Sequence, residues 1–235
     1  MGYYADNLSG ERLRECYEIA PPRVKQYLAA EIAHVLGLLR PGDTVLELGC
    51  GYGRVAFELA RAGVHVTGID TSAGSIALAE RLRMGESACK FLEMNATALA
   101  FPDDTFDSVI CIQNGICAFN TDKHALVSEA LRVTRPGGRA VFSTYAATFW
   151  SERLRWFELQ AESGLLGDID RGATGEGTIV CVDGFRSGAV SPTELREICR
   201  SVGIDPFLTE VDGSSLFCEL LKPDLRPGAS SGIIA

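Results

Sequence analysis

The sequence has neither a long apolar stretch nor a recognisable leader. Its 235 residues contain no uninterrupted run of the about 18 apolar residues that a membrane-spanning helix needs. The N-terminus begins with neither the basic segment nor the apolar segment of a secretory signal. We therefore expect a soluble, cytoplasmic protein that has no membrane partner.

Clustered cysteines are also lacking. The eight cysteines are scattered, no two of them form a CxxC pair, and most stand inside apolar runs. This distribution is typical of reduced, buried thiols in a cytosolic protein. It gives no sign of a metal site, and we expect none.

Basic residues are outnumbered by acidic ones. The chain has 22 lysines and arginines against 31 aspartates and glutamates, which gives a formal net charge of -9. A protein that binds nucleic acid needs a basic surface to neutralise the phosphates, and the overall charge offers none. The composition therefore argues against nucleic acid and favours a small molecule as the partner.

Internal repeats are absent, and the only low-complexity stretch is the C-terminal tail. With 46% hydrophobic residues, a chain of this length can form one sizeable core. We expect a single domain over residues 1–225 and a disordered tail over residues 226–235. Within the domain, residues 1–40 are expected to form a helical cap, and residues 146–190 an insertion that covers the substrate.

Strand and helix patterns alternate through the middle of the chain. Short apolar runs rich in strand formers are each followed by helical periodicity or a turn, and the connections are short. Such alternation predicts a parallel sheet with helices packed on it. The expected strands are residues 44–48, 64–70, 90–94, 108–112 and 139–144, and the expected helices are residues 54–61, 72–83 and 123–133.

The flanking segments carry boundary signals. Prolines at 21–22 and at 41 delimit an amphipathic helix, and Pro136-Gly137-Gly138 is expected to turn the chain into the fifth strand. Ser191 begins a capping box that should start the last helix. A strand hairpin over residues 207–221 is expected to close the chain.

The segment after the fifth strand has no regular rhythm. It should contain an aromatic helix, a glycine-rich region at 164–177 and a strand at 178–182. The aromatic side chains of this helix are either ordinary core or, in part, an apolar wall for a substrate, and the sequence leaves both interpretations open. These side chains are Phe149, Trp150, Trp156 and Phe157.

The most informative stretch is VLELGCGYGR at residues 45–54. Three glycines at alternate positions follow a strand and precede a helix, so the backbone can turn tightly and a ligand can approach it closely. Asp70 stands 19 residues after Gly51, at the end of the next expected strand. A carboxylate there can accept hydrogen bonds from the two hydroxyls of a ribose. An ordinary turn would not need this acid, so the combination predicts a nucleoside ligand.

A dinucleotide is the rival ligand. Its fingerprint places the third glycine three residues after the second and holds a pyrophosphate at the helix N-terminus. Here the third glycine comes one residue earlier, and Glu47 would repel a pyrophosphate. An acid at this position suits a ligand that carries a sulfonium and an ammonium group. An NAD(P)-dependent oxidoreductase nevertheless stays an alternative.

Four motifs together resemble the class I S-adenosylmethionine-dependent methyltransferases. They are ELGCGYG, the strand end GID, the run FPDDTFD, and LRVTRPGG, which span about residues 40–145. The resemblance implies an α/β, Rossmann-like, doubly wound sheet of seven strands in the order 3-2-1-4-5-7-6, with strand 7 antiparallel. It also implies S-adenosylmethionine as cofactor and S-adenosylhomocysteine as product.

The resemblance further implies where the cofactor lies. Asn95-Ala96 matches the pair that the family places against the adenine ring, and Gln113 follows the fourth strand, where the methionine end is expected. Asn114 is expected to face the substrate. The expected cofactor-binding residues are Glu47, Gly49, Cys50, Gly51, Gly53, Asp70, Thr71, Asn95, Ala96 and Gln113.

Methyl transfer from a sulfonium is an in-line displacement that depends mainly on positioning the acceptor and excluding water. A general base is needed only for an acceptor of high pKa. Weak candidates for this base are Tyr145, His124, Tyr17 and Asp212. The three histidines are expected to be structural, and Tyr3, Tyr4 and Tyr17 either fold over the cofactor or pack at the surface.

The accepting atom is left open by the sequence. An oxygen or nitrogen of a small molecule is favoured, and a thiol or metalloid is the next alternative because Cys111 and Cys117 bracket the fourth-strand edge. Buried thiols are the preferred interpretation of this pair. A second class of function, a cofactor-binding regulator without catalytic activity, also stays an alternative. The chain could also form a homodimer.

Overall fold

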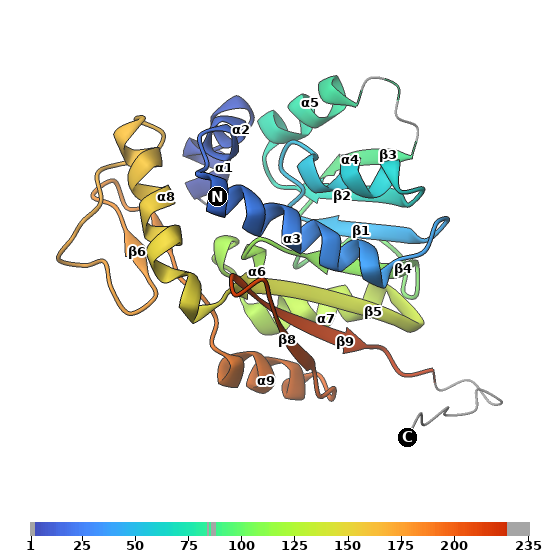
Figure 1. Ribbon diagram of the computed structural model, residues 1–235. Coiled ribbons are helices and arrows are strands. Elements are labelled where there is room, and N and C mark those ends of the chain that lie inside the picture. Colours follow the sequence, from blue (N-terminus) through green and yellow to red (C-terminus); the bar gives the residue numbers. More distant parts are fainter. Residues whose placement is uncertain (1–2, 84, 86–87, 225–235) are drawn as a thin grey trace.

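The computed structural model describes residues 3–83, 85 and 88–224 (Figure 1). Its described residues form a seven-stranded sheet in the order β3-β2-β1-β4-β5-β9-β8. The first five strands pair in parallel, and β9 runs antiparallel to both β5 and β8. This confirms the expected fold, with β8 and β9 as the sixth and seventh strands. The strands are β1 (Thr44–Leu48), β2 (His65–Asp70), β3 (Cys89–Glu93), β4 (Phe106–Cys111), β5 (Thr134–Tyr145), β8 (Phe207–Val211) and β9 (Ser215–Leu221).

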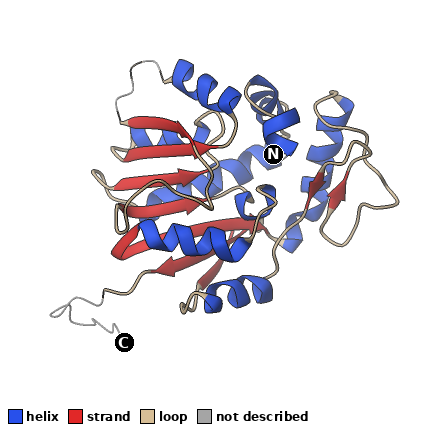
Figure 2. Ribbon diagram, turned by 180° about the vertical axis from the view of Figure 1, so that it is seen from behind, coloured by secondary structure: helices blue, strands red, loops and turns tan. Residues whose placement is uncertain are grey.

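Helices cover both faces of the sheet (Figures 1 and 2). Side chains alternate along each strand, so Val45 packs on one face and Leu46 on the other. The face of Val45 is covered by α3 (Pro22–Leu38), α4 (Arg54–Arg61) and α5 (Ala73–Leu82). The opposite face is covered by α6 (Gly115–Ala118), α7 (Lys123–Val133) and α9 (Pro192–Ser201).

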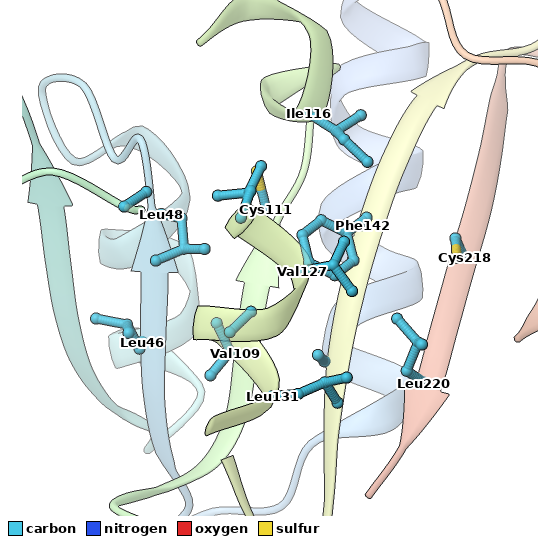
Figure 3. Packing of buried hydrophobic residues seen from close by; sticks show 14 of the residues in the cluster. Leu46, Leu48, Val109, Cys111, Ile116, Val127, Leu131, Phe142, Cys218 and Leu220 are labelled. Carbon is cyan, nitrogen blue, oxygen red and sulfur yellow. The ribbon is translucent and has the colours of Figure 1, made fainter. Parts of the chain in front are cut away.

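The core on the α7 face is shown in Figure 3. Leu46 and Val109 from neighbouring parallel strands belong to one cluster with Leu131 and Val127 of α7 and Phe142 of β5, and Val109 is seen between Leu46 and Leu131. Each such side chain removed from water contributes about 1.5–3 kcal/mol. This packing fixes the strand ends at which the candidate site lies.

Polar caps begin three of the helices. Ser72 Oγ accepts a hydrogen bond from the backbone N–H of Ser75, Asp122 accepts one from His124, and Ser191 accepts one from Glu194. The last of these confirms the expected start of α9. A cap of this kind contributes about 1 kcal/mol.

A third apolar cluster joins the N-terminal helices to the segment after β5. The N-terminal helices are α1 (Tyr3–Asn7) and α2 (Glu11–Glu18), and the later segment forms η1 (Ala147–Phe149), α8 (Trp150–Glu162) and a hairpin of β6 (Ile179–Val180) with β7 (Arg186–Ser187). Arg12 donates to the carbonyls of Gly164 and Leu165, and Trp156 Nε1 donates to the carbonyl of Cys16. These contacts hold α2 beside α8 (Figure 1).

Two boundary predictions need correction. Pro136-Gly137-Gly138 lies within β5 as a bulge, because Phe106 pairs with Thr134 while Ser108 already pairs with Arg139. The backbone of this bulge still bonds to Lys222, so the strand continues through it. The expected strand at 178–182 is shortened to β6, since only two of its residues pair with β7. The predicted disordered tail at 226–235 lies outside the described residues.

No helix in the described part of the chain is both long and apolar enough to cross a bilayer.

Candidate functional site

The glycine turn between β1 and α4 has a backbone that other residues rarely adopt. Gly49, Gly51 and Gly53 have φ angles of 75°, 54° and 88°. A Cβ atom on Gly49 would come within 2.5 Å of the Phe119 ring, and one on Gly53 within 2.8 Å of the Phe91 ring. The amides of Gly49 and Cys50 both donate to the carbonyl of Ile69, at 2.8 and 2.9 Å. The turn is therefore tied to β2.

Asp70 joins this turn to the next helix. Its Oδ2 accepts a hydrogen bond from Gly51 N at 3.0 Å, and its Oδ1 accepts one from Ser72 N at 2.8 Å. Burial raises the pKa of Asp70, and the donors Ser72 and Gly51 oppose that rise. Each carboxylate oxygen keeps a second lone pair for a ligand. The structure therefore places Asp70 against the glycine turn, and its contact with a ribose stays a prediction.

A cavity of about 560 Å³ lies along the carboxyl ends of the parallel strands. Its wall runs from Asn95 after β3, past Asp70 at the end of β2, to Tyr145 at the end of β5. Open parallel sheets bind ligands at this edge. Of the residues predicted to bind the cofactor, those in the wall are Gly49, Gly51, Asp70, Thr71, Asn95, Ala96 and Gln113.

A smaller lobe of about 40 Å³ adjoins this cavity and shares Gly49, Gly51 and Gln113 with it. Glu47 and Cys50 lie in its wall, together with Arg54. Gly53 lines neither space, and it instead caps the start of α4 in a left-handed conformation.

The small lobe gathers buried polar atoms that have no partner. Among the described residues, four buried side-chain nitrogen or oxygen atoms lack a hydrogen bond, and three of them line this lobe. They are Glu47 Oε2, Arg54 Nη2 and Gln113 Nε2. Leaving such a group unsatisfied costs about 1–3 kcal/mol, and native proteins generally avoid it. A ligand with complementary charges would satisfy all three atoms.

Without a ligand, the ionised form of Glu47 is disfavoured. Burial raises its pKa to about 8, against the opposing attraction of Arg54 and a hydrogen bond from the Ala56 backbone. Arg54 itself stacks on Tyr17, with its guanidinium carbon 4.9 Å from the ring centre. A bound cation beside Glu47 would favour the ionised carboxylate.

Gln113 is held by a buried network. Its backbone N–H donates to Glu31 Oε2 at 3.0 Å and to Ser143 Oγ at 2.8 Å, and its Oε1 accepts a hydrogen bond from Tyr17 at 3.0 Å. Glu31 on α3 is fully buried and also accepts from the hydroxyls of Ser143 and Ser215. Burial raises the pKa of Glu31 to about 7. Since Gln113 has a φ of 56°, these bonds fix an uncommon backbone conformation.

Two of the four candidate bases lie away from the cavity. His124 Nδ1 contacts Ser201 Oγ at 2.7 Å, between α7 and α9. Asp212 is bonded to Arg23, Gln26 and Ser214 at the β8–β9 turn, and these bonds hold its pKa low although burial opposes ionisation. Neither residue lines the cavity formed by the described chain.

Tyr17 and Tyr145, the other two candidates, do line the cavity. Burial raises the pKa of Tyr145 to about 12, although the nearby Arg153 lowers it, and burial raises the pKa of Tyr17 further. Both phenols are therefore neutral near pH 7. They can donate hydrogen bonds but are poor proton acceptors.

The expectation that Asn114 faces the substrate is wrong. Its Oδ1 accepts a hydrogen bond from Thr144 Oγ1 at 2.8 Å, and its Nδ2 donates to the Gly188 carbonyl at 3.0 Å. The side chain is buried, and it does not belong to the cavity wall. Asn114 instead anchors the end of the insertion to the sheet.

The aromatic and sulfur side chains differ in whether they line the cavity. Trp156 and Phe157 line the cavity, as do Tyr4 and Tyr17, whereas Phe149 and Trp150 do not. Cys111 and Cys117 also lie outside the wall, and burial raises the pKa of both thiols. Within the described ranges, no group of three or more potential metal-ligating side chains is found.

Residues 45–138 match a family model described as a methyltransferase domain. The matched region contains the glycine turn, Asp70, Asn95 and Gln113. Residues 45–138 are thus those of a methyltransferase domain, and the chain resembles the class I S-adenosylmethionine-dependent methyltransferases.

Curated methyltransferases are similar to this chain over part of their length. The 2-methyl-6-phytyl-1,4-hydroquinone methyltransferase of Synechocystis sp. is 35% identical over 142 residues, which make up 57% of this chain and 42% of that protein. The ubiquinone biosynthesis O-methyltransferase of Aromatoleum aromaticum is 32% identical over 167 residues, or 70% of this chain and 64% of that protein. The chain thus spans about half the length of the curated relatives it matches.

Solved methyltransferase structures share the fold. Magnesium protoporphyrin IX methyltransferase of Synechocystis, solved with bound SAH, superposes with a TM-score of 0.61 at 18% identity, over 94% of this chain and 96% of that one. A putative S-adenosyl-L-methionine-dependent methyltransferase of Methanococcus maripaludis gives a TM-score of 0.65 at 12% identity, over 91% and 93%. At these identities the likeness concerns the methyltransferase fold alone.

Two residues of this candidate site were not predicted from the sequence. Arg54 directly follows the third glycine, so its position next to the turn was a signal that could have identified it. Glu31 had only one signal, an acid on the apolar face of an amphipathic helix. Its contacts with β5 and β9 arise from tertiary packing that no local pattern reveals.

Proposed function

We propose that the protein transfers a methyl group from S-adenosylmethionine to a small-molecule acceptor and releases S-adenosylhomocysteine. The observation that carries this proposal is the set of unpartnered atoms on Glu47, Arg54 and Gln113 beside the glycine turn. An acid next to a cation and an amide donor suits the ammonium and carboxylate of an amino acid. A nicotinamide dinucleotide has no such zwitterion, and its pyrophosphate would meet Glu47.

The other cofactor contacts follow from the cavity wall. Asp70, held by two backbone donors, would accept hydrogen bonds from the ribose hydroxyls. Asn95 and Ala96 would lie against the adenine ring, since both line the cavity after β3. Cys50 and Thr71 would contribute through their place beside the turn and beside Asp70.

When bound, S-adenosylmethionine supplies a methyl group on a positively charged sulfur, which a nucleophile displaces in line. The chain's own part is to orient the acceptor and exclude water. Buried aromatic side chains, among them Tyr145, Trp156 and Phe157, line the cavity for this purpose. Because burial raises the pKa of Tyr17 and Tyr145, both are neutral near pH 7 and would serve as hydrogen-bond donors to the acceptor rather than as its general base.

The segments around the sheet complete this proposal. Residues 1–225 would act as one methyltransferase domain in the cytoplasm, with residues 1–40 as cap and residues 146–190 over the acceptor. The third apolar cluster contains side chains of α2, α3 and α8, and this packing of the cap against the insertion supports the proposed roles of the two segments. The names of the curated relatives favour an oxygen or carbon acceptor on a quinone-type ring, rather than a thiol or metalloid.

Calorimetry with S-adenosylhomocysteine tests the cofactor. We expect binding by the native chain, and a loss of about 10–100-fold in Asp70→Ala, since hydrogen bonds to a charged group contribute about 1.5–3 kcal/mol. Asp168→Ala, at an exposed acid of the insertion, is the matched control and should bind normally. The proposal fails if S-adenosylhomocysteine does not bind and Asp70→Ala changes nothing.

A thermal-shift comparison separates the oxidoreductase alternative. At 100 times its dissociation constant, a bound ligand stabilises the fold by about 2.7 kcal/mol. For a chain of this size that corresponds to a rise in Tm of about 5–11 °C. We expect this rise with S-adenosylhomocysteine and none with NADH. Turnover is then measured with labelled S-adenosylmethionine and a panel of metabolites, which also separates an enzyme from a silent regulator.

A further inference from the structure

The cavity has two chemically different halves. The half over β1, β2 and β3 contains the glycine turn, Asp70 and Asn95. The half beyond β4 is walled by Tyr27 of α3, Tyr145 of β5, and residues of α8, which packs beside the N-terminal helices (Figure 1). If the first half takes the methyl donor, the second half takes the acceptor.

One face of α8 forms the outer wall of this acceptor half. Trp156, Phe157 and Gln160 all line the cavity. Gln160 follows Trp156 by four residues and Phe157 by three, which places the three side chains on one face of the helix. Two aromatic rings therefore flank a single carboxamide.

Gln160 is buried but has no partner for its side chain. Only 3% of the residue is exposed. Its backbone carbonyl accepts a hydrogen bond from Leu165, whereas its carboxamide bonds to no side chain or backbone group of the described residues. The carboxamide is not one of the four fully buried atoms without a partner, because it keeps access to the cavity that it lines. A carboxamide that faces a cavity can bond to the molecule that occupies it. The carboxamide thus offers both a donor and an acceptor to whatever fills the cavity.

The acceptor half offers no charge to a ligand. In the part of the chain that is described, Asp70 is the only charged side chain in the cavity wall, and it lies in the donor half. Arg153 stacks behind the wall, 4.2 Å from the Tyr145 ring centre, and donates to the carbonyls of Gly177, Ser187 and Gly188. An acceptor with its own unpaired charge would lose hydration without gaining a partner.

We propose that Gln160 determines acceptor specificity, by binding the hydroxyl or carbonyl of an uncharged ring molecule that packs between α8 and Tyr145. This inference depends on the proposed methyl transfer, since it assigns the donor to the other half of the cavity. The flat aromatic walls favour a ring, and the single carboxamide selects one that carries a hydrogen-bonding oxygen. A site built around a polar contact rejects analogues that lack it.

Three probes of matched shape test the proposal on the complex of the full chain with S-adenosylhomocysteine. They are 2-naphthol, naphthalene and 2-naphthoate, whose binding is followed by calorimetry or by quenching of tryptophan fluorescence. We expect 2-naphthol to bind at least about 10-fold more tightly than either of the others, since one hydrogen bond and one unpaired charge each contribute on this scale.

Gln160→Met removes the carboxamide and keeps an unbranched side chain of similar length. We expect it to weaken 2-naphthol binding about 10-fold or more, to leave naphthalene binding within about twofold, and to leave the affinity for S-adenosylhomocysteine unchanged. Gln26→Met is the matched control, because Gln26 is exposed on α3, away from the cavity, and its side chain donates to Asp212. This variant should bind all three probes like the native chain.

Different failures have different meanings. If the native chain does not bind S-adenosylhomocysteine, the proposed function fails, and this inference falls with it. If S-adenosylhomocysteine binds but Gln160→Met keeps the native preference for 2-naphthol over naphthalene, only the role of Gln160 is refuted. Equal binding of 2-naphthoate and 2-naphthol, or binding of none of the three probes, overturns the assignment of an uncharged ring acceptor.

Discussion

Cofactor binding should release a proton from Glu47. The carboxyl is buried beside the glycine turn, burial raises its pKa to about 8, and its Oε2 has no partner. Near pH 7 the free protein therefore holds Glu47 mostly protonated. An ammonium group placed against this carboxyl favours the ionised form, so the proton must leave when the ligand binds.

The size of the effect follows from the pKa. A group with a pKa of about 8 is about 90% protonated at pH 7, and one with a pKa of about 7 is half protonated. We therefore expect S-adenosylhomocysteine to release about 0.5–0.9 protons at pH 7. The number should fall towards zero at about pH 9, where the carboxyl is already ionised in the free protein.

Calorimetry in two buffers of different ionisation enthalpy measures this number directly. Glu47→Gln should remove the proton release and weaken binding, whereas Glu197→Gln, at an exposed acid of α9, should change neither. A release below about 0.2 protons at pH 7 in the native chain, or a release that survives in Glu47→Gln, would refute the assignment of Glu47 to the ammonium group.

Two further predictions concern stability. Gly49→Ala should destabilise the fold by about 1–3 kcal/mol, because residue 49 has a φ of 75° and an added Cβ would meet Phe119. Gly37→Ala, in an open position of α3, should instead stabilise the fold by about 0.5–1 kcal/mol. Urea unfolding of both variants measures the two changes. Since burial raises the pKa of Glu31 to about 7, its contribution to stability is complete below about pH 4.5 and is lost as the pH rises through 7. Native stability should fall between pH 5.5 and 8.5, and Glu31→Gln should reduce that fall by up to about 2 kcal/mol; an unchanged pH profile would contradict the burial of an ionisable Glu31.

The parts of the site that could be predicted from the sequence are those that short, contiguous sequence patterns encode. The glycine turn follows from a strand pattern, three glycines and a helix start, and each of these signals is local. Asp70 could be placed because a parallel sheet brings the ends of β1 and β2 to one edge. The bulge in β5 was mistaken for a turn, since proline and glycine carry the same local signal in both.

Long-range packing explains what could not be predicted. Glu31 and Ser215 are separated by most of the chain, yet they meet beneath Gln113 because α3 and β9 pack against the same strands. Asn114 had the residue type and the position of a substrate ligand, but Thr144 and Gly188 satisfy its carboxamide. Which polar group stays free for a ligand depends on such neighbours.

The two halves of the cavity also differ in whether local sequence or long-range packing forms them. The donor half comes from one continuous stretch, and the family model matches that stretch from residue 45 to 138. The acceptor half is assembled from α3, α8 and the end of β5, which are far apart in the sequence, and the two helices have the pattern of ordinary amphipathic helices. Trp156 and Gln160 on α8 have no sequence signal that separates them from surface residues of a helix; they line the cavity because α2 and Tyr145 pack around them. The chemistry of the acceptor can therefore be inferred from the assembled cavity but not from a sequence motif.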